Sequence, residues 1–459
     1  MNFRFLLASA GCLLALGPAR AQVLPRLSGD WRAALGPLTL TAHLHDPASG
    51  PRSATLDVPE QHAQGLPLDF SVRGDSVFFY LAVAHARFAG KRAADGQTLA
   101  GDWEQAGRLI PLTFTRLVAG QVPAAAPRRP QTPKGPFPYR STAVTFASPA
   151  PSVTLAGTLT EPAGPGPFPA VVLLTGSGPE DRDETIFGHK PFAVLADYLA
   201  RRGVAVLRFD DRGVGQSTGT LQGTTSADYA ADARTALAWL RAQPGIEKQH
   251  VGLLGHSEGG TAAVLAAGQP QPPNFLVLLA APGIAGNELI VQQTVALARL
   301  RGDGPAALAT VEQQERQVLA AVTQNPSNAQ ARAKLLPLLT AAGVNSPQAD
   351  QVIAQLTSPG YRALLTDRPA QDLAKVRCPV LALNGSKDVQ VAAGPNLAGI
   401  RQGLQAAGNP DATVRELPGL NHLFQTAATG SVAEYGTSEE TFAPAALQVI
   451  GDWVVAHSK

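Results

Sequence analysis

The chain has 459 residues, of which 45% are hydrophobic and 16% are charged, and its formal net charge is +2. A chain of this length and hydrophobic content can bury at least one large core, and two or three domains are expected. The near-neutral charge implies no basic surface for nucleic acid, and the 45 Gly and 38 Pro lie mostly between apolar runs, which argues against global disorder.

Residues 1–21 have the pattern of a secretory signal peptide. Arg4 precedes an apolar stretch that ends at Leu16, and the small residues Ala19 and Ala21 follow. The stretch is shorter than the about 20 apolar residues that span a bilayer, and no later segment is longer. We therefore expect cleavage near Ala21, export to the periplasm or the medium, and no transmembrane segment.

Cleavage of this signal changes the charge and the cysteine content of the chain. It removes two arginines and no acid, so the formal net charge falls from +2 to zero. Cys378 is then the one cysteine left, which makes an intramolecular disulfide impossible. It lies in the apolar run RCPVLALNG, and a buried, inert thiol is expected.

Residues 22–118 are predicted to form a small β-rich domain. Short alternating runs such as LTLTAHL, SVFFYLAV and IPLTFTRL are separated by Gly, Pro and Asp, a pattern typical of an antiparallel barrel or sandwich. Residues 119–141 are dense in Pro and Ala and have no apolar period. They are predicted to form an extended linker between domains.

Residues 142–459 are predicted to form a second, larger domain of alternating strands and helices. Apolar strands such as AVVLLTG, VAVLRFD and VGLLGH alternate with helical stretches rich in Ala and Leu, which predicts a mostly parallel sheet covered by helices on both faces. At about residues 284–370 the alternation stops, and apolar residues recur at helical spacing with no convincing strand. This insert is predicted to be a helical cap above the strand ends.

The segment VGLLGHSEGG predicts a nucleophile elbow. An apolar strand runs through Gly255 and His256 to Ser257, and a helical stretch begins after Gly259. The turn brings strand and helix close together and holds Ser257 in a strained backbone conformation. A side chain at Gly255 or Gly259 is therefore expected to clash.

A serine hydroxyl becomes a good nucleophile when a histidine removes its proton and an acid orients that histidine. The fold expects the order serine, acid, histidine along the chain. Asp388 follows the strand PVLALNG, and His422 follows the strand-like TVREL, so each lies in a loop just past a strand end. Ser257, Asp388 and His422 are the predicted catalytic residues. The alternative for Asp388 is a turn carboxylate, and for His422 an ordinary loop histidine.

Two backbone N–H groups are expected to bind the oxyanion that forms during attack on a carbonyl. One is that of Glu258, directly after the nucleophile. The other is assigned to Ser177 or Gly178, in the loop that follows the strand AVVLLTG, where small residues allow the main chain to approach the substrate. The alternative is that these glycines form only a tight turn.

Two charged segments near these loops are interpreted as structural. Asp210–Arg212 is expected to form an ion-pair network in the pocket wall without a chemical role. Glu180–Glu184, with the sequence EDRDE, contains an arginine and has no clearly placed histidine partner. It is therefore expected to be a solvated or Arg-paired loop, and no metal site is predicted.

The motifs TGSGPEDRD, RFDDRGVGQSTG, GHSEGG, LNGSKDVQV and GLNHLFQ occur in this order. Together they make residues 142–459 resemble the bacterial esterases of the EstD type within the α/β-hydrolase superfamily. The resemblance implies carboxylesterase activity on short acyl chains, with Ser257, Asp388 and His422 at the matching positions. The N-terminal part is similar to the β-rich domain that often precedes such catalytic domains. One departure is Gly360, where related proteins tend to carry a larger aromatic residue, and it leaves the shape of the acyl pocket open.

The expected function is hydrolysis of small, short-acyl esters through an acyl-enzyme, with no metal or organic cofactor. The expected partner is a small-molecule ester, and no nucleic acid is expected to bind. One alternative is a serine peptidase of the aminopeptidase kind, which would use the same three residues and would need buried carboxylates for the substrate ammonium. Another is an envelope binding protein whose β domain binds a glycan, a lipid or a partner.

Overall fold

In the computed structural model, residues 26–458 are described except for 36–37, 48–49, 59–62, 82–83, 85, 106–107, 118–127, 343 and 345. The predicted signal peptide lies outside the described residues, as does most of the first half of the predicted linker. The chain divides into two compact units, Met1–Leu35 with Thr39–Gln121 and Gly36–Leu38 with Val122–Lys459.

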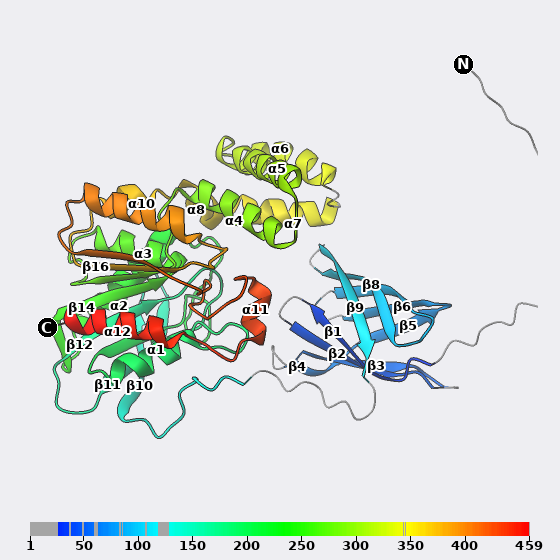
Figure 1. Cartoon of the computed structure of the whole chain (residues 1–459), viewed down its shortest axis with the longest axis horizontal. Helices are drawn as coiled ribbons and strands as arrows, with labels where there is room; N and C mark the ends of the chain where they lie inside the picture. The colour runs from blue at the N-terminus through cyan, green and yellow to red at the C-terminus, as the bar shows by residue number, and fades with distance from the viewer. Residues whose placement is uncertain are drawn as a thin grey trace, which may run out of the picture. The chain divides into compact units, whose positions relative to one another are not determined.

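The first unit contains a sheet of nine strands, coloured blue to cyan in Figure 1. These are β1 (Gly29–Leu35), β2 (Leu38–His45), β3 (Ser53–Val58), β4 (Ala63–Pro67), β5 (Asp69–Arg73), β6 (Ser76–Leu81), β7 (Ala86–Arg92), β8 (Thr98–Gln105) and β9 (Arg108–Arg116). Their order in the sheet is β4-β3-β2-β1-β9-β8-β7-β6-β5. All the strand pairs with a described register are antiparallel.

This sheet is a nearly closed barrel, which agrees with the predicted β-rich domain and selects the barrel over the sandwich. Alternate residues of its strands point inward, and β6 and β7 show this as strictly alternating burial. The aromatic rings of Phe79, Phe88 and Phe114 contact one another at centroid distances of 5.1–5.4 Å. Such contacts fill the interior of a small barrel.

The second unit is built on a sheet of eight strands. These are β10 (Tyr139–Ala147), β11 (Thr154–Pro162), β12 (Phe168–Leu174), β13 (Ala205–Phe209), β14 (Ile246–His256), β15 (Leu276–Leu279), β16 (Val380–Gly385) and β17 (Ala412–Leu417). Their order is β10-β11-β13-β12-β14-β15-β16-β17. The strands from β13 to β17 pair in parallel, whereas β10 and β11 are antiparallel. The predicted mostly parallel sheet is confirmed.

Helices cover both faces of this sheet (Figure 1). One face carries α2 (Ser226–Arg241), α3 (Glu258–Ala267), α9 (Pro369–Leu373) and α10 (Ala393–Ala406), and the other carries α1 (Pro191–Ala200) and α12 (Pro444–Ala456). β12 divides its side chains between the two cores: Val172 faces the first set of helices and Val171 faces the second. Successive side chains of β12 point to opposite faces of the sheet, and both faces are apolar. The segment AVVLL is therefore continuously hydrophobic. The short helix α11 (Val432–Thr437) lies in the loop region after β17.

Local sequence explains where the covering helices begin. Thr225 caps α2 in a capping box with Asp228, since each side chain accepts a hydrogen bond from the other residue's backbone N–H. Helices α1 and α12 begin with Pro191 and Pro444, which have no N–H to leave unpaired in the first turn.

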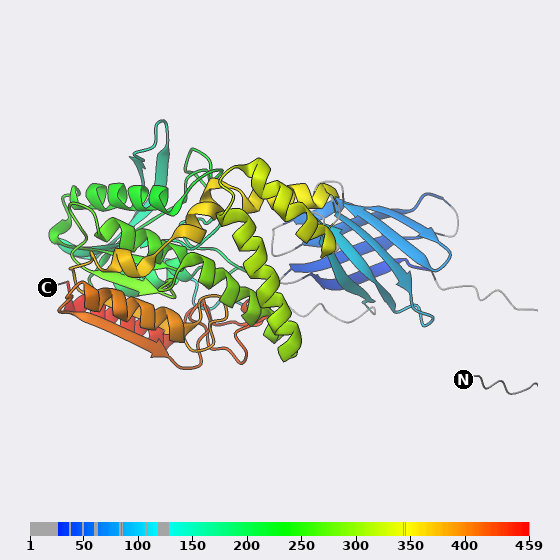
Figure 2. The ribbon, with the colours of Figure 1, turned by 90° about the horizontal axis from the view of Figure 1, so that it is seen from above.

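The predicted helical insert lies between β15 and β16. It comprises α4 (Gly286–Leu300), α5 (Pro305–Thr323), α6 (Asn328–Ala341), α7 (Ser346–Leu356) and α8 (Pro359–Thr366), and α9 follows it. Residues of the insert, among them Val291, Val322, Leu335 and Ile353, form a hydrophobic core of their own. Figure 2 shows α4–α7 as a group distinct from the layers of the sheet. The prediction that this stretch is helical is confirmed.

No helix among the described residues combines the length and the hydropathy needed to cross a membrane. Cys378 is partly buried beside the core under the sheet, and burial raises the pKa of its thiol to about 11. A thiol with such a pKa is almost entirely protonated at neutral pH, which agrees with the expected inert role.

Candidate active site

Ser257 lies at the sharp turn between β14 and α3. Its backbone has φ 51° and ψ −120°, a left-handed conformation that is unfavourable for a residue with a side chain. Its N–H donates to the carbonyl of Leu279 at the end of β15, at 2.9 Å. The sharp, strained turn predicted from GHSEG is therefore present at the carboxyl end of the parallel sheet.

The two flanking glycines are required by close backbone contacts. A Cβ atom on Gly255 would lie 2.1 Å from the carbonyl oxygen of Gly259. A Cβ atom on Gly259 would lie 2.2 Å from the carbonyl oxygen of Leu174 and 2.4 Å from that of Thr175. Real Cβ atoms do not approach oxygen so closely, so the structure bears out the clash that we expected at both positions.

We predict that Gly259→Ala lowers the free energy of unfolding by about 1–3 kcal/mol or prevents folding, because the added methyl group meets main-chain carbonyls that cannot move independently of β12. The matched control is Gly394→Ala in α10, where a Cβ atom has no neighbour within 4 Å. The control is expected to be neutral or slightly stabilising, since alanine favours helix over glycine. Urea denaturation of both variants checks the difference, and equal midpoints would contradict it.

Asp388 and His422 are brought together by the loops after β16 and β17. The Nδ1 atom of His422 lies 2.7 Å from Oδ2 of Asp388, and both side chains are buried. The other carboxylate oxygen, Oδ1, accepts the N–H groups of Gln390 at 2.8 Å and Val391 at 2.9 Å. The carboxylate therefore has one oxygen held by the backbone and one directed at the imidazole.

His256 connects the turn that carries Ser257 to the loop that carries His422. Its Nε2 atom lies 2.9 Å from the carbonyl oxygen of His422, and the two imidazole rings have centroids 4.8 Å apart. The three predicted residues thus come from the carboxyl ends of three strands of one parallel sheet. The order of these strands, β14-β15-β16-β17, puts their loops in succession along the same edge.

The loop predicted to hold the second oxyanion donor lies beside Ser257. A Cβ atom on Gly176 would lie 3.5 Å from the Cβ of Ser257. Ser177 and Gly178 are exposed, and Gly178 has φ +114°, which favours glycine. Among the described residues, the N–H groups of Glu258, Ser177 and Gly178 have no hydrogen-bond acceptor. All three remain able to donate to a substrate.

Sequence analysis missed the role of Glu184. Its side chain is buried, and its Oε1 atom lies 2.8 Å from Nδ1 of His256 and accepts the N–H of Gly176 at 2.9 Å. The expectation of a solvated or Arg-paired loop holds for part of EDRDE, since Asp183 pairs with Arg208. It is wrong for Glu184, whose partner is a histidine 72 positions later in the chain. The described residues contain no group of three or more side chains arranged to hold a metal ion.

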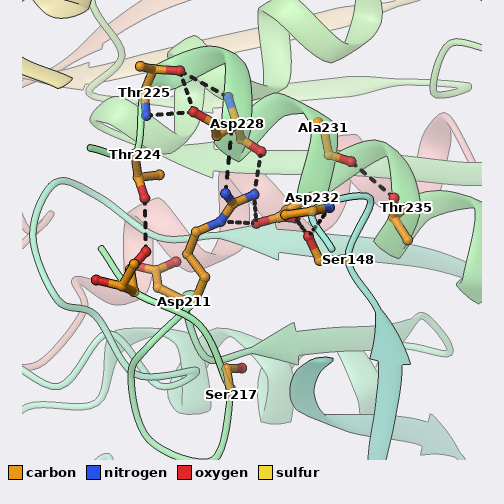
Figure 3. Close-up of polar contacts among 12 residues, drawn as sticks. Ser148, Asp211, Ser217, Thr224, Thr225, Asp228, Ala231, Asp232 and Thr235 are labelled. Carbon is orange, nitrogen blue, oxygen red and sulfur yellow. Dashed lines mark hydrogen bonds and ion pairs between the residues drawn. The ribbon is translucent and has the colours of Figure 1, made fainter. Parts of the chain in front are cut away.

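The interpretation of Asp210–Arg212 as an ion-pair network is correct for its two ends. Asp210 pairs with Arg182 at 2.5 Å. Arg212 pairs with Asp232 at 2.7 Å, and Asp228 lies 3.6 Å away. Figure 3 shows these two acids and Ser148, which donates to Asp232 at 2.6 Å.

Asp211 has no such cation. It accepts hydrogen bonds from the Thr175 hydroxyl at 2.9 Å and from the N–H of Glu180 at 3.3 Å. Burial raises the pKa of Asp211 to about 8, because the two hydrogen bonds that favour the carboxylate are outweighed. The structure therefore corrects the ion-pair interpretation at this position: Asp211 is a carboxylic acid near neutral pH.

We predict that Asp211→Asn stabilises the protein at pH 9 and not at pH 5. A carboxyl whose folded pKa lies above its unfolded value of 3.8 favours folding when protonated, so this contribution is lost progressively as pH rises from 3.8 to about 8. The neutral amide should gain about 1–3 kcal/mol at pH 9. Urea denaturation at both pH values measures it. Asp350→Asn, at an exposed acid paired with Arg332, is the control and should show no such difference between the two pH values.

Gly360 is the second residue of α8 and lies against the loop before α2. A Cβ atom there would lie 2.5 Å from the carbonyl oxygen of Thr224. A larger residue at this position would therefore have to move α8 or that loop. In this chain the glycine allows α8 of the insert to pack closely against the loop before α2.

The carboxyl groups of Glu180 and Glu258 lie near the same site. Burial, together with the nearby charge of Glu184, raises the pKa of Glu180 to about 7. Burial and the nearby charge of Asp367 also raise the pKa of Glu258. The charge of His256 partly opposes the shift at Glu180, and a hydrogen bond from Ser226 partly opposes it at Glu258. The sequence did not reveal either shift.

Part of the chain is similar in sequence to known proteins. The chain is 40% identical over 105 residues to the esterase EstD of Thermotoga maritima, which is 23% of this chain and 25% of that protein. An uncharacterised protein of Mycobacterium tuberculosis is 36% identical over 113 residues, or 25% of this chain and 36% of that protein. The chain thus matches only a quarter to about a third of the length of these relatives.

Among solved structures, the Pyrococcus furiosus esterase is 12% identical and has a TM-score of 0.44, with 74% of this chain and 100% of that chain covered. The α/β hydrolase GrgF from Penicillium is 17% identical with a TM-score of 0.43, covering 70% and 99%. Residues 152–401 match the model of the family described as X-Pro dipeptidyl-peptidase (S15 family). The chain has the α/β-hydrolase fold, and it belongs to the S15 family.

Proposed function

We propose that the protein is a serine carboxylesterase that hydrolyses small, short-acyl esters with Ser257, His422 and Asp388. The observation that carries the proposal is the buried pair of Asp388 and His422, whose side chains lie 2.7 Å apart. Their loops lie at the same edge of the sheet as the strained turn at Ser257. An imidazole oriented by a carboxylate at its Nδ1 presents Nε2 to accept a proton from a serine hydroxyl. The partial identity to an esterase supports the same choice.

The proposed reaction has two steps. His422 takes the proton of Ser257 while the oxygen of Ser257 forms a bond to the ester carbonyl carbon, and the proton is then given to the departing alcohol. Water next attacks the acyl-enzyme, with His422 again as base, and releases the carboxylic acid. The backbone N–H of Glu258 and that of Ser177 or Gly178 bind the oxyanion in both steps. Side chains, main chain and water supply every group in this scheme.

Two measurements on the full chain test this proposal. A fluorophosphonate probe should label the wild-type protein and fail to label Ser257→Ala. A series of nitrophenyl esters with increasing acyl length should then show the highest kcat/KM at short chains. A folded wild-type protein that is neither labelled nor active on any ester would overturn it, and would favour the alternative of an envelope binding protein.

A serine peptidase is the second candidate, and two observations favour it. The matching family is described by a dipeptidyl-peptidase activity, and the acids Glu180 and Glu258 lie near Ser257. Carboxyl groups that are partly desolvated can ionise to bind the ammonium group of a peptide N-terminus. Dipeptidyl anilides with proline as the second residue, compared with nitrophenyl esters at equal concentration, distinguish the two candidates. Higher kcat/KM on the anilides would favour the peptidase.

We further propose that the protein acts outside the cytoplasm, after cleavage of residues 1–21. The support is the signal pattern in the sequence. The binding role considered for the first unit would use a partly open pocket of about 810 Å³ on that unit, which Phe78, Tyr80, Arg87 and Asp102 help to line. Fractionation of cells that express the full chain tests the location.

A further inference from the structure

The imidazole of His256 is buried between two acceptors. Its Nδ1 atom lies 2.8 Å from Oε1 of Glu184, and its Nε2 atom lies 2.9 Å from the carbonyl oxygen of His422. A neutral imidazole has one N–H and can satisfy one of these acceptors, whereas an imidazolium donates to both. Burial by itself lowers the pKa of His256, but the charge of Glu184 outweighs this effect and raises the pKa to about 9.

The side chain of Glu184 makes a second hydrogen bond, which links His256 to the loop after β12. The oxygen that faces His256 also accepts the N–H of Gly176, at 2.9 Å. Gly176 directly precedes Ser177 and Gly178, which are the proposed second oxyanion donor. The start of this loop is thereby attached to the side chain of Glu184.

The backbone at Glu184 is itself strained. Its φ is +53°, which costs a residue with a side chain about 1 kcal/mol or more. The conformation is held by a hydrogen bond from its N–H to the carbonyl of Asp181 at 2.8 Å and by the side chain of Asp181, which accepts the N–H groups on both sides, those of Asp183 and Thr185. The short turn thus directs a carboxylate inward from a charged surface loop.

These contacts join three loops through one continuous set of hydrogen bonds. The loop after β12 is held by Glu184, the turn that carries Ser257 contributes His256, and the loop after β17 supplies the carbonyl of His422. Both ionisable members are less than a tenth exposed. A buried ion pair is weak evidence for stability, because an apolar pair of similar size often stabilises a fold as well or better. The pair therefore calls for another explanation.

We propose that His256 and Glu184 are positioning residues for the hydrolysis, which hold the oxyanion loop and the His422 loop in fixed positions around Ser257. The proposal rests on the roles proposed above for Ser257 and His422. Oxyanion donors act when they lie 2.7–3.1 Å from the developing charge, and a displacement of 1 Å can lower a rate about 100-fold. The pair acts through the residues that it holds and does not itself contact the substrate.

The test uses His256→Gln, Glu184→Gln and the double variant in the full chain. Each single variant should lower kcat for a short nitrophenyl ester about 10- to 100-fold, with KM changed less than about threefold, because binding of the ester does not depend on the exact position of the donors. The double variant should be no slower than the slower single variant, since both changes break the same connection. The labelling rate with a fluorophosphonate should fall in parallel with kcat.

Glu161→Gln is the matched control. Glu161 is also a buried carboxylate, and it pairs with Arg140 at 2.7 Å near the opposite end of the sheet, beside Gly245. Its replacement should reduce stability without lowering kcat. If Glu161→Gln loses as much kcat as Glu184→Gln, the effect on rate comes from stability alone and the proposal is wrong. It is also wrong if His256→Gln and Glu184→Gln keep wild-type kcat.

A second measurement covers variants that fail to fold. In the wild-type protein labelled with ¹⁵N, both ring nitrogens of His256 should carry a proton at pH 7, and a signal from only one would contradict the proposal. Failure of the proposed function looks different, because Ser257→Ala would then keep its activity whatever the state of His256.

Discussion

Ser257→Ala is expected to lower kcat for a short nitrophenyl ester by about four to six orders of magnitude, which is the effect of removing the nucleophile from a serine hydrolase. The methyl group of alanine leaves the hydrogen bond from the N–H of residue 257 to Leu279 in place and cannot form an acyl-enzyme. The backbone strain at φ 51° is the same for both residues. The folded structure should therefore be retained.

Steady-state kinetics and thermal denaturation of Ser257→Ala check this expectation together. The control is Ser327→Ala, which removes the N-cap of α6 in the helical insert and should lower stability slightly without affecting hydrolysis. A Ser257→Ala protein with wild-type kcat, free of contaminating esterase, would exclude Ser257 as the nucleophile.

Asp388→Asn should reduce kcat by about 10⁴-fold, as it does when a histidine is held in the wrong tautomer. Oδ1 of Asp388 accepts two backbone N–H groups, those of Gln390 and Val391. The carbonyl oxygen of asparagine would take this place, which turns its NH₂ group toward Nδ1 of His422. Nδ1 must then accept a hydrogen bond, so the proton moves to Nε2, and the imidazole can no longer take a proton from Ser257.

The tautomer provides a direct readout for this variant. In the wild-type protein the Nδ1 atom of His422 should carry the proton at alkaline pH, and in Asp388→Asn the Nε2 atom should carry it, as ¹⁵N chemical shifts distinguish. Asp372→Asn, at an acid near the surface that pairs with Lys375, is the control and should leave both tautomer and rate unchanged. An unchanged kcat in Asp388→Asn would exclude Asp388 as the orienting acid.

Much of the fold and part of the site could be predicted from local sequence. The parallel strands are continuous apolar runs, and the helical insert has apolar residues at helical spacing. The turn at Ser257 leaves no room for a side chain at Gly255 or Gly259, and this holds for any sequence that forms the same turn. The loops of Asp388 and His422 follow strands that can be identified from the sequence alone. The expected order of serine, acid and histidine along the chain then limits which residues can be the acid and the base.

What sequence did not reveal depends on contacts between distant segments. Glu184 lies in a charged run that looks solvated, and only the strained turn at this residue directs its side chain to His256. Asp211 lies in the sequence between two residues that each form an ion pair. Its own side chain accepts a hydrogen bond from Thr175 and does not contact a cation. The number of sheets in the first unit was also open, because alternating burial is the same in a barrel and in a sandwich.

The helical insert leaves and rejoins the sheet at one narrow place. The N–H of Gly286, at the start of α4, donates to the carbonyl of Asp367 just after α8, and a Cβ atom on Gly286 would collide with the carbonyl of Leu364. About eighty residues therefore leave and return through a joint that is only a few ångströms wide, and they bring their own apolar interior. The insert could therefore change in length without altering how the strands of the sheet pair.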